Sequence, residues 1–510
     1  MQEERAELPN DYIEAARVYH DVTKHSYTSV RSTPHVLEWD NKPLPYKIYP
    51  EVAGLSLPRD LSLSRMPALE AIGPEEVEDP AAALDLPALT RILFSAGGLT
   101  RQRRVGGEIY HFRAAPSAGA LYPIEIYAAA ADVEGLEAGL YHFSPADLKL
   151  RGLRPGDWRA TLVRAAAMRT SIRRARAVVL MSAIFWRSAW KYRARAYRYC
   201  FWDAGTILAN LTAAARAEGI PTETVTAFVD AELEQLLGIH GEREAPLCMV
   251  ALGRTASESR QAAQPAPLKL ETVALSQNEV SYDDLLKMHR ASRLVSTEEV
   301  SAVASARVEP HAPAQSAGAV RPATIRPGEA AGLGETILRR GSTRVFAREP
   351  IGADELATIL ARSSVHPRVD FPPLSDTYMI VNAVEGMEPG AYYYRRESGS
   401  FEMLRGGDFR GQAGYLCLEQ QPLGADSSVL LVYMANLEAA LRALGNRGYR
   451  DVHLEAGILG GRAYLAAYAL GRGATGLTFY DDDTAEFFKP HAAGESALLM
   501  VAIGVPRGSR

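Results

Sequence analysis

Cysteine is scarce in this chain of 510 residues, and so are long hydrophobic runs. The three cysteines, Cys200, Cys248 and Cys417, lie far apart and form no CxxC pair, which excludes a disulfide framework and a cysteine-rich metal site. The longest apolar stretches, such as Ala177 to Trp186, span about ten residues, which suits a buried strand and is too short to cross a membrane. We therefore expect a protein of the reducing cytoplasm that binds no metal.

A secretory signal and a strong excess of charge are also missing. The N-terminus, Met1 to Arg5, is acidic and has no apolar signal segment. The net charge of −5 argues against nucleic acid or an anionic membrane as the main partner, and we interpret the arginine-rich run Arg173 to Arg176 as a solvated helix end. Hydrophobic residues make up 47% of the chain, which is enough for two sizeable cores.

The chain contains an internal repeat. Val133 to Phe143 matches Val384 to Tyr394 at an offset of 251, with six of eleven positions identical. Tyr197-Arg198…Asp203-Ala204-Gly205 matches Tyr449-Arg450…Glu455-Ala456-Gly457 at an offset of 252. A period of this length is a whole domain and not a solenoid unit. We therefore predict two homologous domains that pack like a dimer about a pseudo-twofold axis.

Hydrophobic patterning predicts that each domain is a mixed α/β unit, a sheet with several helices. We place domain 1 at residues 1–255, a partly flexible linker with a helical piece at 256–335, and domain 2 at 336–510. Residues 10–24 are predicted to be helical, with Asn10 as the N-cap. The other predicted helices are 86–94, 204–218, 355–360 and 456–470, and the predicted strands are 124–129, 177–182, 249–252, 429–434 and 498–503.

Two segments have the character of ligand-binding loops, and each occurs in one domain only. Pro116 to Pro123 reads Pro-Ser-Ala-Gly-Ala-Leu-Tyr-Pro, whereas the aligned segment, Pro367 to Leu374, has lost the small residues. Domain 2 instead carries Arg340, Ser342 and Arg344 as Arg-x-Ser-x-Arg. Alternate positions of an extended segment face one side, so these side chains can together bind a phosphate, although a solvated basic turn is the alternative.

A glycine-rich loop, Gly471 to Tyr480, follows the last long helix of domain 2. Its small residues let backbone N–H groups approach a planar ligand, and its spacing is not the dinucleotide fingerprint GxGxxG. In domain 1 we align the phosphate clamp with His25 to Arg31, which has a single arginine, and the late loop with Glu218 to Glu223, where Pro221 lacks an N–H.

The combination of these motifs resembles the flavin-dependent nitroreductase superfamily over about 400 residues of both domains. The Pro-Ser-Ala-Gly-Ala-Leu-Tyr-Pro loop and the early Tyr19-His20…Thr23-Lys24 resemble its SagB/ThcOx branch. The resemblance implies an α+β fold, a mixed α/β sandwich. In the family this sandwich is ordinarily an intertwined homodimer with FMN at the interface, and here two domains of one chain would build it. Members of that branch are FMN-dependent dehydrogenases, and the best-known ones oxidise thiazolines and oxazolines in modified peptides.

The resemblance also implies roles for individual residues. The FMN phosphate and ribityl chain would be held by Arg340, Ser342 and Arg344, with Arg507 as a second candidate phosphate ligand. The residues expected along the flavin ring are Gly473, Ala474, Thr475, Gly476 and Leu477, with Pro116, Ser117, Ala118 and Gly119 reaching across from domain 1. The azoline-oxidising members carry a Lys-Tyr pair that matches Lys191-Tyr192, and domain 2 has Ala443-Leu444 in its place.

We therefore predict one composite FMN site per chain, in an FMN-dependent dehydrogenase or oxidase acting on an azoline-like or amino-acid-derived ring of a peptide or natural product. Lys191 would be the base, provided that burial or neighbouring cations lower its pKa, and Tyr192 would share the proton. The alternatives are a generic NAD(P)H-dependent flavin reductase and a non-catalytic flavin-binding protein. The expected partners are a small-molecule or modified-peptide substrate and a biosynthetic protein that recruits it, and further self-association is left open.

Overall fold

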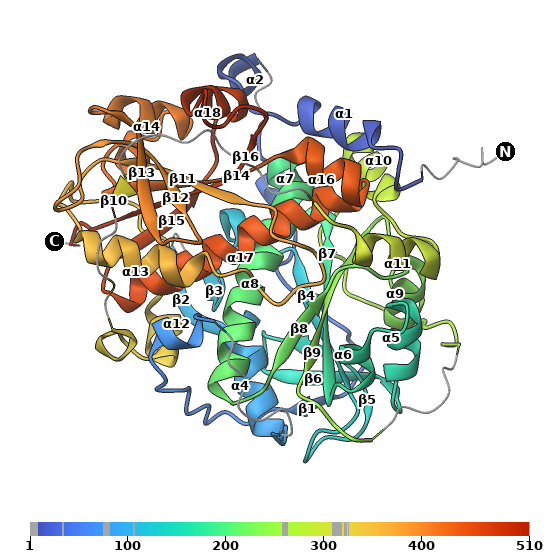
Figure 1. Ribbon diagram of the computed structural model, residues 1–510. Helices are drawn as coiled ribbons and strands as arrows, with labels where there is room; N and C mark the ends of the chain where they lie inside the picture. The colour runs from blue at the N-terminus through green and yellow to red at the C-terminus, as the bar shows by residue number, and fades with distance from the viewer. Residues whose placement is uncertain are drawn as a thin grey trace.

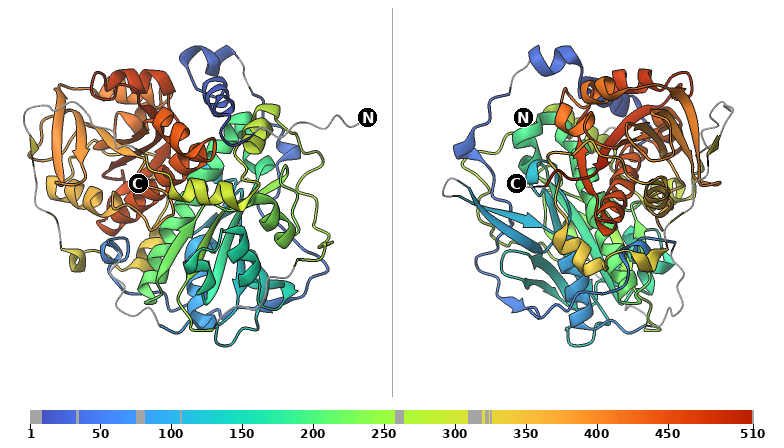
Figure 2. Two further views of the ribbon diagram at one scale, coloured as in Figure 1. Left: turned by 45° about the vertical axis from the view of Figure 1, so that its right-hand side comes forward. Right: turned by 90° about the vertical axis from the view of Figure 1, so that its left-hand side faces the viewer.

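The computed structural model describes residues 9–32, 35–74, 82–105, 108–257, 264–308, 319–320, 324 and 326–508. Each half of this described chain forms a seven-stranded antiparallel sheet with helices around it (Figure 1). The two halves lie side by side, as the turned views in Figure 2 show. The long helices α8 (Ala196–Ala217) and α17 (Arg447–Ala469) pack against each other at the centre. The predicted α+β fold of two tandem domains is confirmed.

The two sheets have the same strand order, so the repeat seen in the sequence is also a repeat of topology. The first sheet runs β1 (Gly54–Ser56), β6 (Lys149–Pro155), β5 (Gly139–Ser144), β4 (Ile124–Ala130), β7 (Ala177–Ile184), β9 (Glu244–Leu252), β8 (Thr222–Val225). The second runs β10 (Ala319–Val320), β13 (Ser400–Gly406), β12 (Gly390–Arg395), β11 (Asp376–Val381), β14 (Val429–Ala435), β16 (Ser496–Gly504), β15 (Gly473–Leu477). Central strands such as β7 are buried at every residue, which explains their continuous apolar sequence.

The remaining elements are helices and one hairpin. The hairpin of β2 (Leu99–Val105) and β3 (Glu108–Arg113) belongs to the first half. The helices of the first half are α1 (Glu14–Val22), α2 (Tyr27–Ser32), α3 (Ala68–Ala71), α4 (Leu86–Gly97), α5 (Arg159–Ala165), α6 (Thr170–Arg173), α7 (Phe185–Tyr192) and α9 (Asp230–Leu237). Those of the second half are α12 (Leu333–Arg339), α13 (Ala353–Ser363), α14 (Arg410–Leu416), α15 (Gln421–Gly424), α16 (Leu437–Leu444) and α18 (Asp481–Phe487).

The prediction of Asn10 as the N-cap of the first helix is wrong. Helix α1 begins at Glu14, and the side chain of Asn10 bonds to the other half instead. Its amide Nδ2 donates to the carbonyl of Leu444 at 3.0 Å, and its Oδ1 accepts from the backbone N–H of Arg447 at 2.8 Å. Asn10 therefore caps the start of α17, a partner that no local sequence pattern indicates.

The predicted linker contains two helices, α10 (Asp283–Ala291) and α11 (Thr297–Ser305). Helix α10 stands to the second half as α1 stands to the first: the carbonyl of His289 accepts from Arg450 at 3.3 Å, and that of His20 accepts from Arg198 at 2.6 Å. Residues 258–263, 309–318, 321–323 and 325 of this segment lie outside the described residues. The domain boundaries at 255 and 336 remain predictions.

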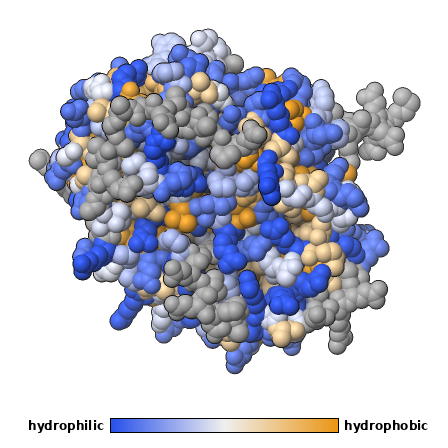
Figure 3. Space-filling model, in the orientation of Figure 1, coloured by the Kyte–Doolittle hydropathy of each residue, from blue (hydrophilic) through white to orange (hydrophobic). Residues whose placement is uncertain are grey.

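The helices α8 and α17 cross at two glycines that are equivalent in the repeat. A Cβ built on Gly205 would lie 2.6 Å from the Cα of Gly457, and one on Gly457 would lie 2.6 Å from the carbonyl oxygen of Trp202. Backbone therefore touches backbone where the two halves meet. The face of the molecule in Figure 3 is mostly hydrophilic, with its hydrophobic residues in small scattered groups, so the extensive apolar packing lies inside.

Gly457→Ala should therefore destabilise the protein by about 1–3 kcal/mol, because the added methyl group has only rigid backbone to push against. The control is Gly411→Ala in helix α14, where a Cβ would meet nothing within 4 Å. That change should be neutral or stabilise by up to about 1 kcal/mol, since alanine favours helices over glycine. Denaturant unfolding of both variants measures the difference, and equal effects would contradict the close crossing.

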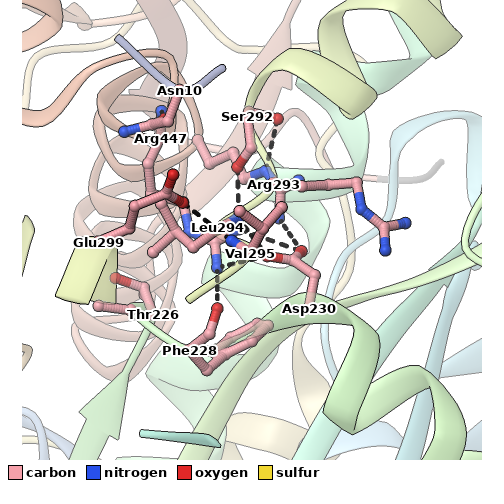
Figure 4. Close-up of polar contacts among 12 residues, drawn as sticks. Asn10, Thr226, Phe228, Asp230, Ser292, Arg293, Leu294, Val295, Glu299 and Arg447 are labelled. Carbon is pink, nitrogen blue, oxygen red and sulfur yellow. Dashed lines mark hydrogen bonds and ion pairs between the residues drawn. The ribbon is translucent and has the colours of Figure 1, made fainter. Parts of the chain in front are cut away.

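Two buried ionic clusters join the halves reciprocally. Asp230, at the start of α9 in the first half, pairs with Arg447 of α17 at 3.0 Å (Figure 4). It also pairs with Arg450 of the same helix at 3.0 Å. Burial alone would raise the pKa of Asp230, but the two arginines outweigh this effect and lower the pKa to about 2. The pseudo-twofold counterpart is Asp481 at the start of α18 in the second half, which pairs with Arg195 at 3.0 Å and Arg198 at 2.8 Å. Each half thus supplies the carboxylate that the other half's arginines require.

Candidate functional site

A cavity of about 340 Å³ opens between the two halves and gathers most of the predicted site residues. From the first half it is lined by Pro116, Ser117, Ala118, Gly119, Lys191 and Tyr192, and from the second half by Ser342, Arg344, Thr475, Gly476 and Leu477. Four predicted residues, Arg340, Gly473, Ala474 and Arg507, are not part of its lining. Residues separated by more than three hundred positions in sequence therefore form one site.

The Pro-Ser-Ala-Gly loop has a backbone shape that its small residues permit. Gly119, Ala120 and Tyr122 all have positive φ values, of 63°, 53° and 51°. A Cβ on Gly119 would lie 2.8 Å from the hydroxyl of Tyr192 and 3.3 Å from Nζ of Lys191. Glycine is required here for its left-handed conformation and for this close approach. The loop and the Lys-Tyr pair are therefore one packed unit at the cavity wall.

Two residues of helix α8 that the sequence analysis did not single out hold this loop. Asp203 accepts from the Ser117 hydroxyl at 2.5 Å and from the Ala118 N–H at 2.9 Å, and Thr206 donates to the carbonyl of Pro116 at 2.8 Å. Burial raises the pKa of Asp203 to about 7. Two signals could have indicated these residues. Asp203 and Thr206 are three positions apart and so lie on one face of the helix, and a carboxylate is unusual in an Ala-rich helix.

Lys191 and Tyr192 form the C-terminal end of helix α7. Lys191 is exposed to the cavity, yet partial desolvation, followed by the positive charges of Arg344 and Lys42, lowers its pKa from the ordinary lysine value. Burial raises the pKa of Tyr192, so its phenol stays protonated at neutral pH. The next residue, Arg193, has a φ of 53°, and its repeat counterpart is Gly445 with a φ of 67°. A non-glycine residue in this conformation marks a strained turn directly after the pair.

Three aromatic residues that the sequence analysis missed, Tyr199, Trp202 and Tyr464, form another part of the wall. The rings of Tyr192 and Tyr199 stack with centroids 4.1 Å apart, and Tyr199 meets Trp202 edge-on at 4.7 Å. The Tyr464 hydroxyl accepts from the Gly476 N–H. Gln420, Leu499 and Val501 complete the lining from the second half. The cavity thus combines apolar, aromatic surface with a few polar groups, as ligand sites commonly do.

The three clamp residues do not all face the cavity, contrary to the prediction. Arg340 is the C-cap residue of helix α12, and its side chain does not join those of Ser342 and Arg344 at the cavity. Its buried guanidinium donates to the carbonyls of Ala114 and Arg113 at 2.8 Å each, directly before the Pro-Ser loop. Ser342 and Arg344 do line the cavity, and among the described residues no hydrogen bond or ion pair engages the Arg344 side chain. Arg507 is exposed elsewhere.

The predicted glycine-rich loop is a strand. Residues Gly473–Leu477 form β15, the strand at one edge of the second sheet, which pairs with β16. A Cβ on Gly473 would lie 2.2 Å from the Thr343 hydroxyl, so glycine is needed at this position. Gly473 packs against Thr343 and does not line the cavity. The outer edge of β15 still faces the cavity through Thr475 and Gly476, so the small residues serve close approach to a ligand from a strand and not from a loop.

At the pseudo-twofold counterpart of this site, the segment aligned with the Pro-Ser loop bonds to the first half. Asp370, aligned with the Pro-Ser loop, accepts from the backbone N–H groups of Thr226 at 2.8 Å and Ala227 at 2.9 Å. The carbonyl of Arg368 accepts from Thr224 at 2.8 Å, so the loop adds to the edge of β8, the counterpart of β15. In the open site that edge belongs to the cavity.

The alignment of the clamp with His25 to Arg31 is also corrected. Those residues belong to α2 and the segment before it, where Arg31 bonds to Glu419 and Tyr480 of the second half. By element order, the counterpart of the clamp lies between α3 and α4, at residues 72–85, of which 75–81 lie outside the described residues. That segment contains no arginine and several acidic residues, so the first half lacks a phosphate clamp.

Neither a metal cluster nor a membrane helix occurs in the described part of the chain. No group of three or more His, Cys, Asp or Glu side chains there is placed to hold a metal ion. Likewise, none of the described helices has both the length and the apolar character needed to cross a membrane.

The nitroreductase family model matches residues 79–254 and 337–505, which is more than half of the chain. This protein belongs to the nitroreductase family, with two copies of the family domain. A protein of Methanocaldococcus jannaschii named as a nitroreductase is 32% identical over 198 residues, covering 37% of this chain and 95% of the relative.

Among solved structures, a protein of Anabaena variabilis named as a nitroreductase superposes with a TM-score of 0.77 and 26% identity, over 97% of this chain and 99% of that one. The Escherichia coli microcin synthetase McbBCD complex also matches, with 18% identity, 48% and 94% coverage and a TM-score of 0.31.

Proposed function

We propose that this chain is an FMN-dependent oxidoreductase of the SagB/ThcOx type, which removes a hydride and a proton from an azoline-like or amino-acid-derived ring in peptide or natural-product tailoring. The observation that carries the proposal is the meeting of Lys191-Tyr192 and the Pro-Ser-Ala-Gly loop with Ser342 and Arg344 in one cavity. The second half of the chain has neither the Lys-Tyr pair nor the Pro-Ser-Ala-Gly loop, but it supplies Ser342 and Arg344 to the same cavity. A small molecule or a peptide brought by a partner protein would enter there.

The chemistry of the cavity wall suits FMN. Arg344 offers a guanidinium with no competing ion pair among the described residues, and Ser342 offers a hydroxyl, as a phosphate requires. The edge of β15 and the loop at Gly119 leave space for a ring system to approach backbone, and Trp202 and Leu499 supply apolar cover. When bound, FMN supplies the acceptor for the substrate hydride.

The protein's own part in the proposed reaction is proton transfer and positioning. Lys191 acts as a base only when neutral, and its lowered pKa brings the neutral form into reach at a lower pH than for a solvated lysine. Arg344 adds to this effect from the opposite half, so the same cation that favours an anionic cofactor also favours a neutral base. Tyr192 remains a phenol and can donate a hydrogen bond to the substrate or to Lys191.

The occupied counterpart site supports one cofactor per chain. Asp370 uses the backbone donors that a second ligand would need, and Lys191-Tyr192 is replaced there by Ala443-Leu444. We expect this loop to close one of the two equivalent positions, which would leave one cofactor site per chain.

The test of this function begins with the visible absorption spectrum of the purified protein, which should show bound flavin. Anaerobic addition of a thiazoline- or oxazoline-containing peptide should then bleach the flavin band, and mass spectrometry should detect a loss of two hydrogens from the peptide. A protein that carries no flavin and gains none from added FMN would refute the proposal.

A generic NAD(P)H-dependent flavin reductase is the second candidate, favoured by the name of the Methanocaldococcus relative. In that case NADH or NADPH would bleach the flavin rapidly, and Lys191→Ala would leave the rate unchanged. The proposed dehydrogenase should show slow bleaching by either nucleotide and rapid bleaching by its substrate.

A further inference from the structure

We infer that Asp203 is a positioning residue, whose carboxylate sets the Pro-Ser-Ala-Gly loop in the conformation that the flavin site requires. This inference rests on the proposed function, because the position of the loop matters to catalysis only if flavin binds beside it. Asp203 lies on α8, is 4% exposed and lines the cavity directly below the loop.

The hydrogen bonds show how one carboxylate fixes the loop. One oxygen of Asp203 accepts from the Ser117 hydroxyl, and the other accepts from the Ala118 N–H. The Ser117 oxygen in turn accepts from the N–H of Tyr122 at 2.9 Å, which closes the loop on itself. Three residues of this loop have positive φ, so external bonds must hold a backbone that would otherwise relax.

The loop transmits its position to the Lys-Tyr pair through contact. The Cα of Gly119 lies so close to Tyr192 that no Cβ fits, and Lys191 is its next neighbour. A shift of the loop therefore shifts the groups that would meet the substrate. Asp203 bonds to Ser117 and Ala118, so it acts on the Lys-Tyr pair through the loop.

The repeat supplies a natural comparison for Asp203. Its counterpart on α17 is Glu455, which is fully buried. Glu455 accepts from the backbone N–H of Leu374 at 3.0 Å, and Leu374 belongs to the second half's own counterpart of the loop. Glu455 has a second partner, His366, at 3.0 Å, and its pKa is lowered, although burial opposes this. Both carboxylates thus anchor a loop, and only that of Asp203 borders the cavity.

The surroundings of Asp203 make its anchoring dependent on pH. Burial raises its pKa to about 7, while the bonds from Ser117 and Ala118 oppose this rise. The ionisable groups that interact with Asp203 are Tyr122 of the loop, Tyr192 of α7 and Cys200 of its own helix, and burial raises the pKa of all three, so they stay neutral near pH 7.

Cationic side chains also lie near Asp203. Arg113 and Arg340 lie under the loop, where burial lowers the pKa of each from a value far above neutrality. Arg344 lines the cavity beyond Tyr192, and Lys191 shares that wall. Because the pKa of Asp203 is raised to about 7, its carboxylate is ionised above that pH, and the loop is then held most firmly.

Raising the pH has opposite effects on the loop and on the whole protein: it strengthens the anchoring of the loop and lowers the free energy of unfolding. A raised carboxyl pKa means that the folded protein favours the neutral form, so this stabilisation is present at low pH and is lost as the pH rises through about 7. Asp203→Asn cannot ionise, and its amide N–H₂ would face one of the two loop donors. The variant should lose loop anchoring at every pH and also lose the decline of thermal stability between about pH 4 and pH 7, the interval between the ordinary and the raised pKa of Asp203.

The experiment compares wild type, Asp203→Asn and the matched control Glu455→Gln by hydrogen exchange at pH 8, using peptides that cover 116–122 and 367–374. Asp203→Asn should speed exchange in 116–122 at least tenfold and leave 367–374 unchanged, and Glu455→Gln should do the reverse. In the flavin-loaded protein, the flavin absorption of wild type and Glu455→Gln should titrate with a midpoint near pH 7, and that of Asp203→Asn should not.

Unchanged exchange in residues 116–122 of Asp203→Asn would overturn the inference, and so would an equal loss of the flavin titration in both variants. The exchange measurement needs no cofactor, so it separates the two proposals. A chain that never binds flavin refutes the proposed function, whereas the exchange pattern then still decides whether Asp203 anchors the loop.

Discussion

Lys191→Ala should keep bound flavin and lose substrate oxidation by about a hundredfold or more, the usual range for a positioned acid–base group. The lysine lines the cavity from α7, and its lowered pKa favours the neutral form that a base requires. Ser342 and Arg344 lie on the opposite half. The rate of flavin bleaching by substrate in a stopped-flow spectrometer measures the loss. Tyr192→Phe should reduce the rate in the same direction while preserving the stacked ring on Tyr199.

The pH profile gives an independent check on Lys191. A base must be neutral, so the wild-type rate should rise with pH and level off above the lowered pKa of Lys191. In Lys191→Ala this rise should disappear. The matched control is Lys42→Ala, which removes a cation that lowers the Lys191 pKa, so the rise should move to higher pH without loss of the plateau. Wild-type turnover by Lys191→Ala would return the protein to the class of generic flavin reductases.

Arg344→Ala should release most of the flavin, and the wild-type chain should bind one FMN and not two. Loss of charge-assisted bonds to a phosphate costs about 2 kcal/mol, roughly thirtyfold in Kd, which empties a moderately tight site at micromolar protein. The flavin released by denaturation, measured against protein concentration, gives both numbers. A ratio near two would contradict the closed counterpart site at Asp370.

The matched control for the clamp is Arg348→Ala, four residues further along the same segment. Arg348 is exposed, pairs with Asp426 at 2.5 Å and lies outside the cavity, so its loss should leave the flavin content unchanged. Arg340→Ala is expected to act differently from Arg344→Ala. It should loosen the backbone at Arg113 and Ala114 as well as the cofactor, because its guanidinium holds those carbonyls.

The sequence predicted the repeat and the meeting of its loops because both depend on features with a local signature. A constant offset over long stretches requires equivalent folds, and the strand orders of the two sheets agree with it. Small residues in Pro116 to Pro123 indicate a backbone that must bend and be approached, which the positive φ values of this loop bear out.

The details that could not be predicted depend on contacts between distant segments. Arg340 turns away from Arg344 because a helix ends between Arg339 and Arg340, and a helix boundary is uncertain by a residue or two from sequence. Asp203 carries no motif of its own, since its partners lie 86 and 85 positions away. The closing of the counterpart site by Asp370 depends on backbone donors at Thr226 and Ala227, which no sequence pattern reveals.

The loop at Asp370 illustrates an evolutionary consequence of encoding both copies of the domain in one chain. A symmetric homodimer encodes both of its sites with one sequence, so a residue that blocks one site blocks the other. In this chain the blocking loop and the open loop are separate stretches of sequence, and each is free to mutate alone. The closed position can then specialise in holding the halves together, while the open position adapts to its ligand without any demand that its mirror image still work.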